Sequence, residues 1–191
     1  LRSMASLRAE VLLPGHGLPV IGPERVRAAL ENTAEVLESL HGQTIALMNG
    51  GARLDEILHS VRVPAHLADL PYLRPVYDDP EFVVRNIWRL YGGWWDGNPA
   101  TLKPAPEADL ARELADIAGG AARLAERART LAADGELRLA GHLVAWARLA
   151  DPSDEDISAA YREIFTRRSD EEPSTMAKNI FGDTADRSPG H

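Results

Sequence analysis

The spacing of apolar residues predicts a mainly α-helical chain whose first long element begins at Pro23. Proline and the glutamate that follows it suit the first turn of a helix, because the missing N–H is not needed there and the acid faces the positive dipole end. Behind them, apolar and small side chains recur at alternating steps of four and three, which is the period of one helix face. The positions of this stripe are Val26, Leu30, Thr33, Leu37, Leu40, Thr44 and Leu47. We expect the helix to end at Asn49, before two glycines.

Two shorter helices and a loop are predicted next. Residues 54–61 keep a helical period until Pro64 stops it. Residues 64–79 are rich in Pro, Leu and Tyr without a clear period, which predicts an ordered loop. Another helix is predicted over residues 80–91, where two glycines break the pattern. Its expected stripe consists of Val83, Ile87, Leu90 and Tyr91.

From about Glu107 the pattern changes to short alanine-rich helices, divided at Gly119-Gly120 and at Asp134-Gly135. Small alanines allow helices to approach closely, so we expect antiparallel hairpins similar to those of tetratricopeptide repeats, although no strict repeat is present. The apolar positions expected to face the core are Leu110, Leu114, Ile117, Ala121, Leu124, Ala128 and Leu131, followed by Leu139, Leu143, Trp146 and Ala150.

The last predicted helix opens at Ser153, which together with Asp156 resembles a capping box. Its expected buried stripe consists of Ile157, Ala160, Tyr161, Ile164 and Phe165. Beyond about Arg167 the sequence is polar apart from residues 176–181, so we expect an extended segment that ends in a disordered tail at residues 186–191.

One strand is predicted ahead of these helices, over the apolar run at residues 9–13. The backbone groups of a buried strand must be paired, and the pattern offers this strand no partner. Because the chain also opens on Leu1, directly before this strand, we expect it to be a fragment of a longer protein.

Composition narrows the function classes. The 191 residues carry 29 acidic and 21 basic side chains, for a net charge of −8, which argues against nucleic acid as a partner. No apolar stretch reaches the roughly 20 residues of a membrane span, and no signal peptide is visible. The absence of cysteine excludes disulfides, thiolate zinc sites and thiol nucleophiles, but it leaves the localisation unknown.

The first candidate for chemistry is His16, which stands between Gly15 and Gly17 at the end of the predicted strand. Glycine allows a sharp backbone turn, so the imidazole is presented to its surroundings and is suited to bind a metal. The alternative is a histidine in a tight surface turn. The other histidines show no compact metal-ligand spacing.

Two motifs resemble those of a known enzyme family. The first is the run Leu13-Pro14-Gly15-His16-Gly17 ahead of a proline-led helix, which resembles the last metal-ligand segment of the metallo-β-lactamase superfamily. The second is RNIWRLYGGWWDGNP at residues 85–99, which resembles a helix and loop of the alkyl sulfatase branch. The alanine-rich helices, with the segment at residues 176–181, are similar to the dimerisation domain of that branch.

This resemblance implies a domain organisation and an activity. Residues 1–50 correspond to the end of a metallo-β-lactamase αββα domain, and residues 51–185 correspond to an α-helical dimerisation domain that forms a homodimer. The implied parent is a zinc-dependent hydrolase of long-chain alkyl sulfate esters, in which two zinc ions hold a hydroxide. The superfamily's first metal motif is absent from this sequence, so we expect the chain to be inactive without a missing N-terminal catalytic half.

The resemblance also implies site residues. His16 corresponds to the final histidine ligand of the zinc pair, while Tyr91 and Arg85 are candidates for binding the substrate. Structural alternatives stand beside them: Tyr91 as a core residue of its helix, and Arg85 as the partner of an acid such as Asp78 or Asp96.

The adjacent Trp94 and Trp95 are interpreted as packing anchors, with a substrate platform as the alternative. Two hypotheses for the whole chain remain: a portion of an alkyl sulfatase, and a free-standing, non-catalytic helical interaction module. A third, in which the metallohydrolase acts on a thioester or phosphoester, is disfavoured by the loop at residues 91–99.

Overall fold

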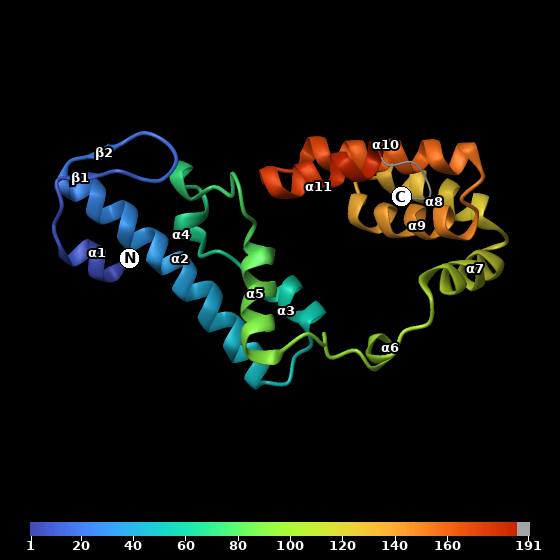
Figure 1. The fold of residues 1–191 in the computed structure, drawn as a ribbon, viewed down its shortest axis with the longest axis horizontal. Coiled ribbons are helices and arrows are strands. Elements are labelled where there is room, and N and C mark those ends of the chain that lie inside the picture. The colour runs from blue at the N-terminus through green and yellow to red at the C-terminus, as the bar shows by residue number, and fades with distance from the viewer. Residues whose placement is uncertain (187–191) are drawn as a thin grey trace. The chain divides into compact units, whose positions relative to one another are not determined.

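The computed structural model describes residues 1–186, and they form a mainly α-helical chain, as predicted (Figure 1). Two compact units are present. The first combines Leu1–Pro75 with Asp79–Asn98, and the second combines Val76–Asp78 with the chain from Pro99 onward. The boundary expected at residue 50 therefore does not coincide with a boundary between these units, and as a domain boundary it stays a prediction.

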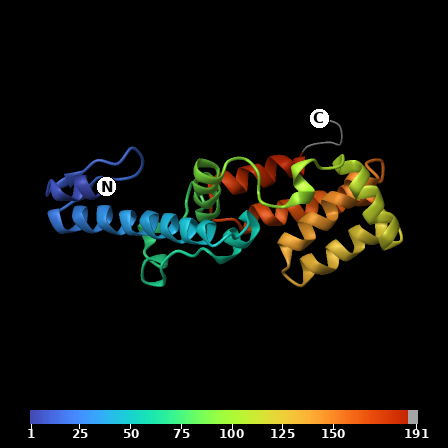
Figure 2. The same ribbon diagram turned by 90° about the horizontal axis from the view of Figure 1, so that it is seen from below.

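The first unit is built on one long helix. Its elements are α1 (Arg2–Ser6), β1 (Val11–Leu12), β2 (Val20–Ile21), α2 (Pro23–Asn49), α3 (Leu54–Ser60), α4 (Ala65–Ala68), the 3₁₀ turn η1 (Pro71–Leu73) and α5 (Pro80–Gly92). The predicted limits of α2 are confirmed, and the predicted loop before α5 contains α4 and η1. The hairpin and α1 lie along the first half of α2 (Figure 2). Helices α2, α3 and α5 share a core of Leu40, Ile57, Leu58, Val61 and Val84.

The expectation that the first strand has no partner is wrong. Strand β1 pairs antiparallel with β2, with Val11 opposite Ile21 and Leu12 opposite Val20. A two-residue strand is too short to produce a readable alternation of apolar and polar positions, so the sequence pattern missed β2. Within residues 1–186, the outer edge of each strand remains without a further strand.

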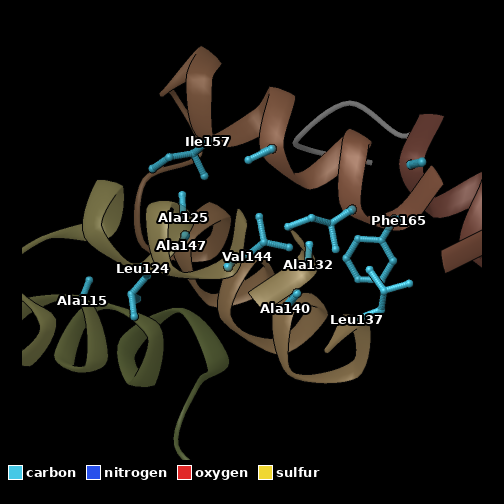
Figure 3. Packing of buried hydrophobic residues seen from close by; sticks show 14 residues of the cluster. Ala115, Leu124, Ala125, Ala132, Leu137, Ala140, Val144, Ala147, Ile157 and Phe165 are labelled. Atoms are coloured by element: carbon cyan, nitrogen blue, oxygen red, sulfur yellow. The ribbon is translucent and has the colours of Figure 1, made fainter. Parts of the chain in front are cut away.

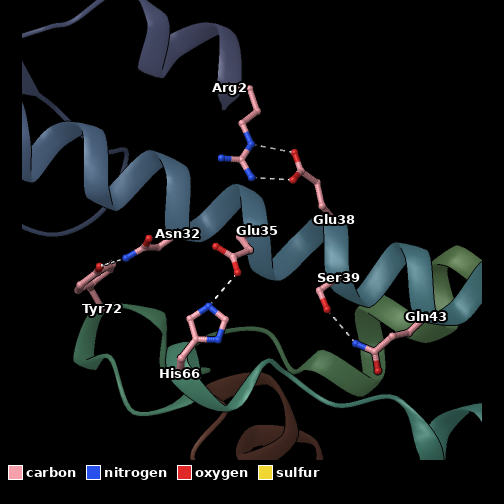
Figure 4. A network of polar contacts seen from close by, with 8 residues as sticks. All are labelled: Arg2, Asn32, Glu35, Glu38, Ser39, Gln43, His66 and Tyr72. Atoms are coloured by element: carbon pink, nitrogen blue, oxygen red, sulfur yellow. Dashed lines mark hydrogen bonds and ion pairs between the residues drawn. The ribbon is translucent and has the colours of Figure 1, made fainter.

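Exposed polar contacts fix the smaller elements to α2 (Figure 4). The guanidinium of Arg2 in α1 donates to both carboxylate oxygens of Glu38, at 3.0 and 2.7 Å. The hydrogen bond from Arg2 holds the pKa of the Glu38 carboxyl below its usual value. His66 Nε2 lies 2.8 Å from Glu35 Oε1, and this contact holds α4 to α2. Solvent screens these contacts, so they direct the packing more than they stabilise it.

The second unit is a bundle of short helices: α6 (Pro99–Leu102), α7 (Glu107–Ala118), α8 (Ala121–Ala133), α9 (Leu137–Ala150), α10 (Glu155–Glu171) and α11 (Thr175–Asp186). The predicted breaks at the glycine pair and at Asp134-Gly135 are confirmed. Helix α9 packs against α7, α8 and α10. Fully buried alanines lie on the facing helices: Ala128, Ala140, Ala147 and Ala160. Figure 3 shows Ala140 and Ala147 together with larger members of the same core, such as Val144 and Ile157.

The predicted stripes of α5, α7 and α9 are wrong in one respect: some of their large apolar residues do not face the core. Leu110, Ile117 and Leu139 are exposed, as are Leu90 and Tyr91 at the end of α5. In α7 and α9 the buried positions are Ala111, Ala115, Ala140, Val144 and Ala147. Close helix approach requires small residues at the contact, and the bulky residues of the same helices are then displaced outward.

The C-terminal segment also differs from expectation. The N-cap of α10 is Asp154, whose carboxylate accepts from the Ile157 N–H at 3.0 Å, and Ser153 is not the cap. The chain beyond Arg167 continues as α10 and then forms α11, because α11 buries Ala177 and Ala185. Of the predicted tail, Asp186 ends α11 and residues 187–191 lie outside the described part of the chain.

A distant segment caps the start of α11. Ser174 is fully buried; its Oγ accepts from the Ala177 N–H at 3.3 Å and donates to the Tyr77 carbonyl at 2.8 Å. The next two backbone N–H groups donate to the carbonyls of Val76 and Tyr77, at 2.9 and 3.1 Å. These contacts hold Val76–Asp78 in the second unit. Across residues 1–186, no helix combines the length and the apolar character needed to cross a membrane.

We expect Ala140→Leu to lower the free energy of unfolding of the second unit by about 1–3 kcal/mol, because the added atoms have no room between α8, α9 and α10. Leucine keeps the helix propensity close to that of alanine, so the loss reports packing. Ala122→Leu, at an exposed position of α8, is the control and should change stability by less than about 0.5 kcal/mol. Urea denaturation followed by circular dichroism measures both; equal effects would contradict close packing at Ala140.

Ser174→Ala should lower the free energy of unfolding of the second unit by about 1–3 kcal/mol, because it removes the N-cap of α11 and the hydrogen bond that the buried Ser174 hydroxyl donates to the Tyr77 carbonyl. Ser153→Ala is the matched control, since its hydroxyl is exposed and does not cap α10. Thermal unfolding of the two variants should differ by several degrees. A Ser174 variant as stable as the control would show that the cap is dispensable.

Candidate functional site

His16 lies at the tip of the β1–β2 hairpin and is exposed to solvent. Gly17 has a φ of +92°, a backbone conformation that a residue with a side chain adopts only with strain. The flanking Leu13 and Leu18 are also exposed, the latter to 86%. The glycines thus present the imidazole outward, as the sequence predicts, on a hairpin whose apolar side chains face solvent. The role of His16 as a ligand stays a prediction.

The donors of this chain do not fit a zinc site by themselves. In residues 1–186 no three His, Cys, Asp or Glu side chains come close enough to hold one metal ion, whereas zinc sites in proteins use three or four protein ligands. The other histidines of this part contact partners of their own: His41 contacts Tyr91, His59 contacts Asp55, His66 contacts Glu35 and His142 contacts Trp146.

The two predicted substrate-binding residues lie on α5. The helix begins where the Asp79 carboxylate accepts from the Glu81 N–H at 2.8 Å, and it buries Val84 against α2 and α3. Arg85 and Tyr91 are both exposed. They are six positions apart, so they lie on faces of the helix that differ by about 120°.

The alternative in which Tyr91 is a core residue is wrong, since its side chain is 58% exposed. Its hydroxyl lies 3.2 Å from His41 Nε2, and the two rings meet edge to face with centroids 5.6 Å apart. Sequence reasoning missed His41, because no local signal connects a residue in the middle of α2 to one that lies 50 positions later.

The alternative in which Arg85 pairs with an acid stays a prediction. Asp96 accepts from the Asn98 N–H at 2.8 Å, which stabilises the turn after α5.

The tryptophan loop after α5 is ordered by its indole N–H groups. Trp88, half-buried in the core, donates to the Trp95 carbonyl, and Trp95 donates to the Asn98 carbonyl, both at 2.9 Å. Gly97 has a φ of +88°, and an added Cβ there would lie 3.1 Å from Arg53 Cγ. The interpretation of Trp94 as a packing anchor is wrong, because its side chain is 76% exposed. Leu90, Tyr91 and Trp94 thus leave apolar surface at the end of α5.

A hollow of about 430 Å³ lies in the second unit, between the start of α9 and the end of α10. Glu136, Arg138, Arg168 and Glu171 give its wall both signs of charge. The Arg168 guanidinium is stacked on the Phe181 ring at 4.0 Å, so it is engaged within the bundle. This hollow therefore offers no single-sign site for a charged ligand.

Comparison with known proteins bears on both units. The model of the family described as alkyl sulfatase dimerisation matches residues 53–189. The linear primary-alkylsulfatase of Pseudomonas sp. strain ATCC 19151 is 35% identical over 156 residues, which cover 81% of this chain and 30% of that protein. The alkyl/aryl-sulfatase BDS1 of Saccharomyces cerevisiae is 30% identical over 146 residues, which cover 76% of this chain and 23% of that protein.

A solved structure of an alkylsulfatase is also similar to this chain. The stereoselective inverting sec-alkylsulfatase Pisa1 from Pseudomonas sp. superposes on the whole chain with a TM-score of 0.87 and 26% sequence identity, and the matched part is 31% of its length. The chain thus spans between 23% and 31% of the length of these relatives. Because the family match covers most of the sequence, the chain belongs to the alkyl sulfatase dimerisation family.

Proposed function

We propose that this chain works as the C-terminal part of a zinc-dependent alkyl sulfatase that hydrolyses long-chain alkyl sulfate esters. In this proposal its helices form a homodimer, and its hairpin and α5 contribute to the active site of the longer protein. The support comes from the family match over residues 53–189 and from relatives that are named alkylsulfatases and are three to four times as long as the matched part.

The observation that carries the proposal is the exposed hairpin. Apolar side chains of a folded protein are normally covered, yet Leu13, Leu18 and Ile21 face solvent and both outer strand edges lack a further strand in the described residues. Strands of a preceding catalytic domain would cover this surface. His16 would then lie at that junction as one ligand of a site whose other ligands belong to the longer protein.

Zinc supplies a bound water of lowered pKa and a counter-charge for the sulfate in such enzymes. The residues of this chain contribute to the substrate instead. The Arg85 guanidinium offers parallel N–H donors that match two sulfate oxygens. Tyr91 lies on another face of α5, where its hydroxyl is beside His41, and would contact a different part of the substrate. The exposed Trp94 indole suits contact with an alkyl chain.

His16→Ala in the full-length protein should lower zinc content and reduce sulfate release from dodecyl sulfate at least about 100-fold, because a lost ligand costs more than a lost supporting contact. His59→Ala, at an exposed site on α3, is the matched control and should leave both unchanged. Zinc is measured by mass spectrometry and sulfate by ion chromatography. A full-length, zinc-loaded protein without sulfatase activity would refute the proposal and leave the non-catalytic interaction module.

For the substrate, we expect Arg85→Gln to raise the KM for dodecyl sulfate about tenfold or more, since a charge-assisted pair of hydrogen bonds to the sulfate is lost. Arg89→Gln, one turn further along α5 and also exposed, is the control. Initial rates at a series of substrate concentrations separate KM from kcat. Equal KM values for the two variants would remove Arg85 from the sulfate site.

A further inference from the structure

Helix α9 is unlike its neighbours because it carries few charged side chains. Its 14 residues, LRLAGHLVAWARLA, include Arg138 and Arg148 and no acidic residue. The neighbouring α8 and α10 have charged outer faces, as expected of helices with one side in water.

Within residues 1–186, one face of α9 is uncovered. Leu137, Ala140, Val144 and Ala147 are buried against the other helices. The opposite face presents a stripe at steps of three, four and three, here called the α9 stripe: Leu139, His142, Trp146 and Leu149. Leu139 is 54% exposed and Leu149 39%, and the rings of His142 and Trp146 are in contact with centroids 6.1 Å apart.

We propose that the α9 stripe is the surface through which two copies of this chain associate. The inference rests on the self-association in the proposed function, and it names the contact. Steps of three and four over ten residues are the spacing by which two helices pack knobs into holes. In a twofold dimer the same stripe is offered by both copies, so its self-complementary apolar character fits a second copy.

The contacts around the α9 stripe favour a second copy of the chain as its partner. Trp146 is half-buried by its own bundle and therefore already positioned, and tryptophan is the residue most often dominant in binding energy at protein interfaces. The Arg148 guanidinium lies 4.2 Å from the Tyr161 ring centre, which holds its charge on the α10 side of the helix. The stripe also lies within the residues matched by the dimerisation family.

The area that a stable dimer needs indicates that α9 does not act alone. A standard interface buries about 800 Å² per partner, whereas the stripe is only about 15 Å long. Helix α7 packs against α9 and carries the exposed Leu110 and Ile117. We therefore expect α7 to add to the contact.

The first test compares Leu139→Glu with Ile180→Glu by sedimentation velocity over a range of concentrations. Both positions are exposed leucine or isoleucine in the second unit, at 54% and 56%, so neither variant should unfold. We expect a wild-type dimer, an unchanged Ile180 variant, and a dissociation constant at least about tenfold higher for the Leu139 variant, because a charge would be buried without a partner.

The possible outcomes distinguish self-association of the chain from the specific contact through the α9 stripe. A wild-type chain that is monomeric at every concentration overturns self-association and the α9 contact together. A dimer that persists in Leu139→Glu overturns the α9 contact alone. Loss of sulfatase activity in the longer protein bears on neither measurement.

The second test uses the absence of cysteine from the sequence, which makes any introduced thiol unique. Leu139→Cys and Leu149→Cys are oxidised separately and as a mixture, with Ile180→Cys as the control. Antiparallel helices bring position 139 beside position 149 of the other copy, so the mixture forms disulfide dimers; parallel helices give dimers with each variant alone. No cross-link in any combination, or equal cross-linking of the control, would overturn the proposal.

Discussion

The fold of the second unit depends on small side chains at the points where its helices meet. Ala128, Ala140 and Ala147 are fully buried on α8 and α9, and each lets the facing backbone come closer than a leucine would allow. Packing of this kind is dense, and it leaves little space for larger groups. Leu139 and Leu149 of α9 are directed outward, whereas Leu124 and Leu137 fill the core beside the alanines. The uncovered face of α9 is a direct consequence of how its other face packs.

A second constraint is that buried backbone groups must find hydrogen-bond partners. The first N–H groups of α11 have none within their own helix, and they find them in the carbonyls of Val76 and Tyr77, with Ser174 between them. These contacts place Val76–Asp78 in the second unit, although α5, which follows them in the sequence, belongs to the first.

Local features of this fold were predictable, and contacts between distant residues were not. Proline and glycine act on the backbone within a few residues of their own position. The sequence therefore predicted the start of α2 at Pro23, the start of α8 after its glycine pair, and the exposure of the His16 imidazole between two glycines. The pairing of His41 with Tyr91 spans 50 positions and that of Ser174 with Tyr77 spans 97. No periodicity encodes such pairs. The site residues on α5 came from a motif, and geometry alone would not have selected them.

Two of the apolar surfaces that residues 1–186 expose, the hairpin and the α9 stripe, differ in their chemistry, and each indicates a different partner. On the hairpin, the exposed leucines accompany backbone groups at two free strand edges, so a partner must supply strands as well as side chains. On α9 the backbone is fully hydrogen-bonded within the helix, and only side chains at helical spacing remain to be covered. A sheet suits the first surface and a helix suits the second. We therefore assign the hairpin to the rest of a longer protein, which would supply strands, and the α9 stripe to a second copy, which would supply a helix.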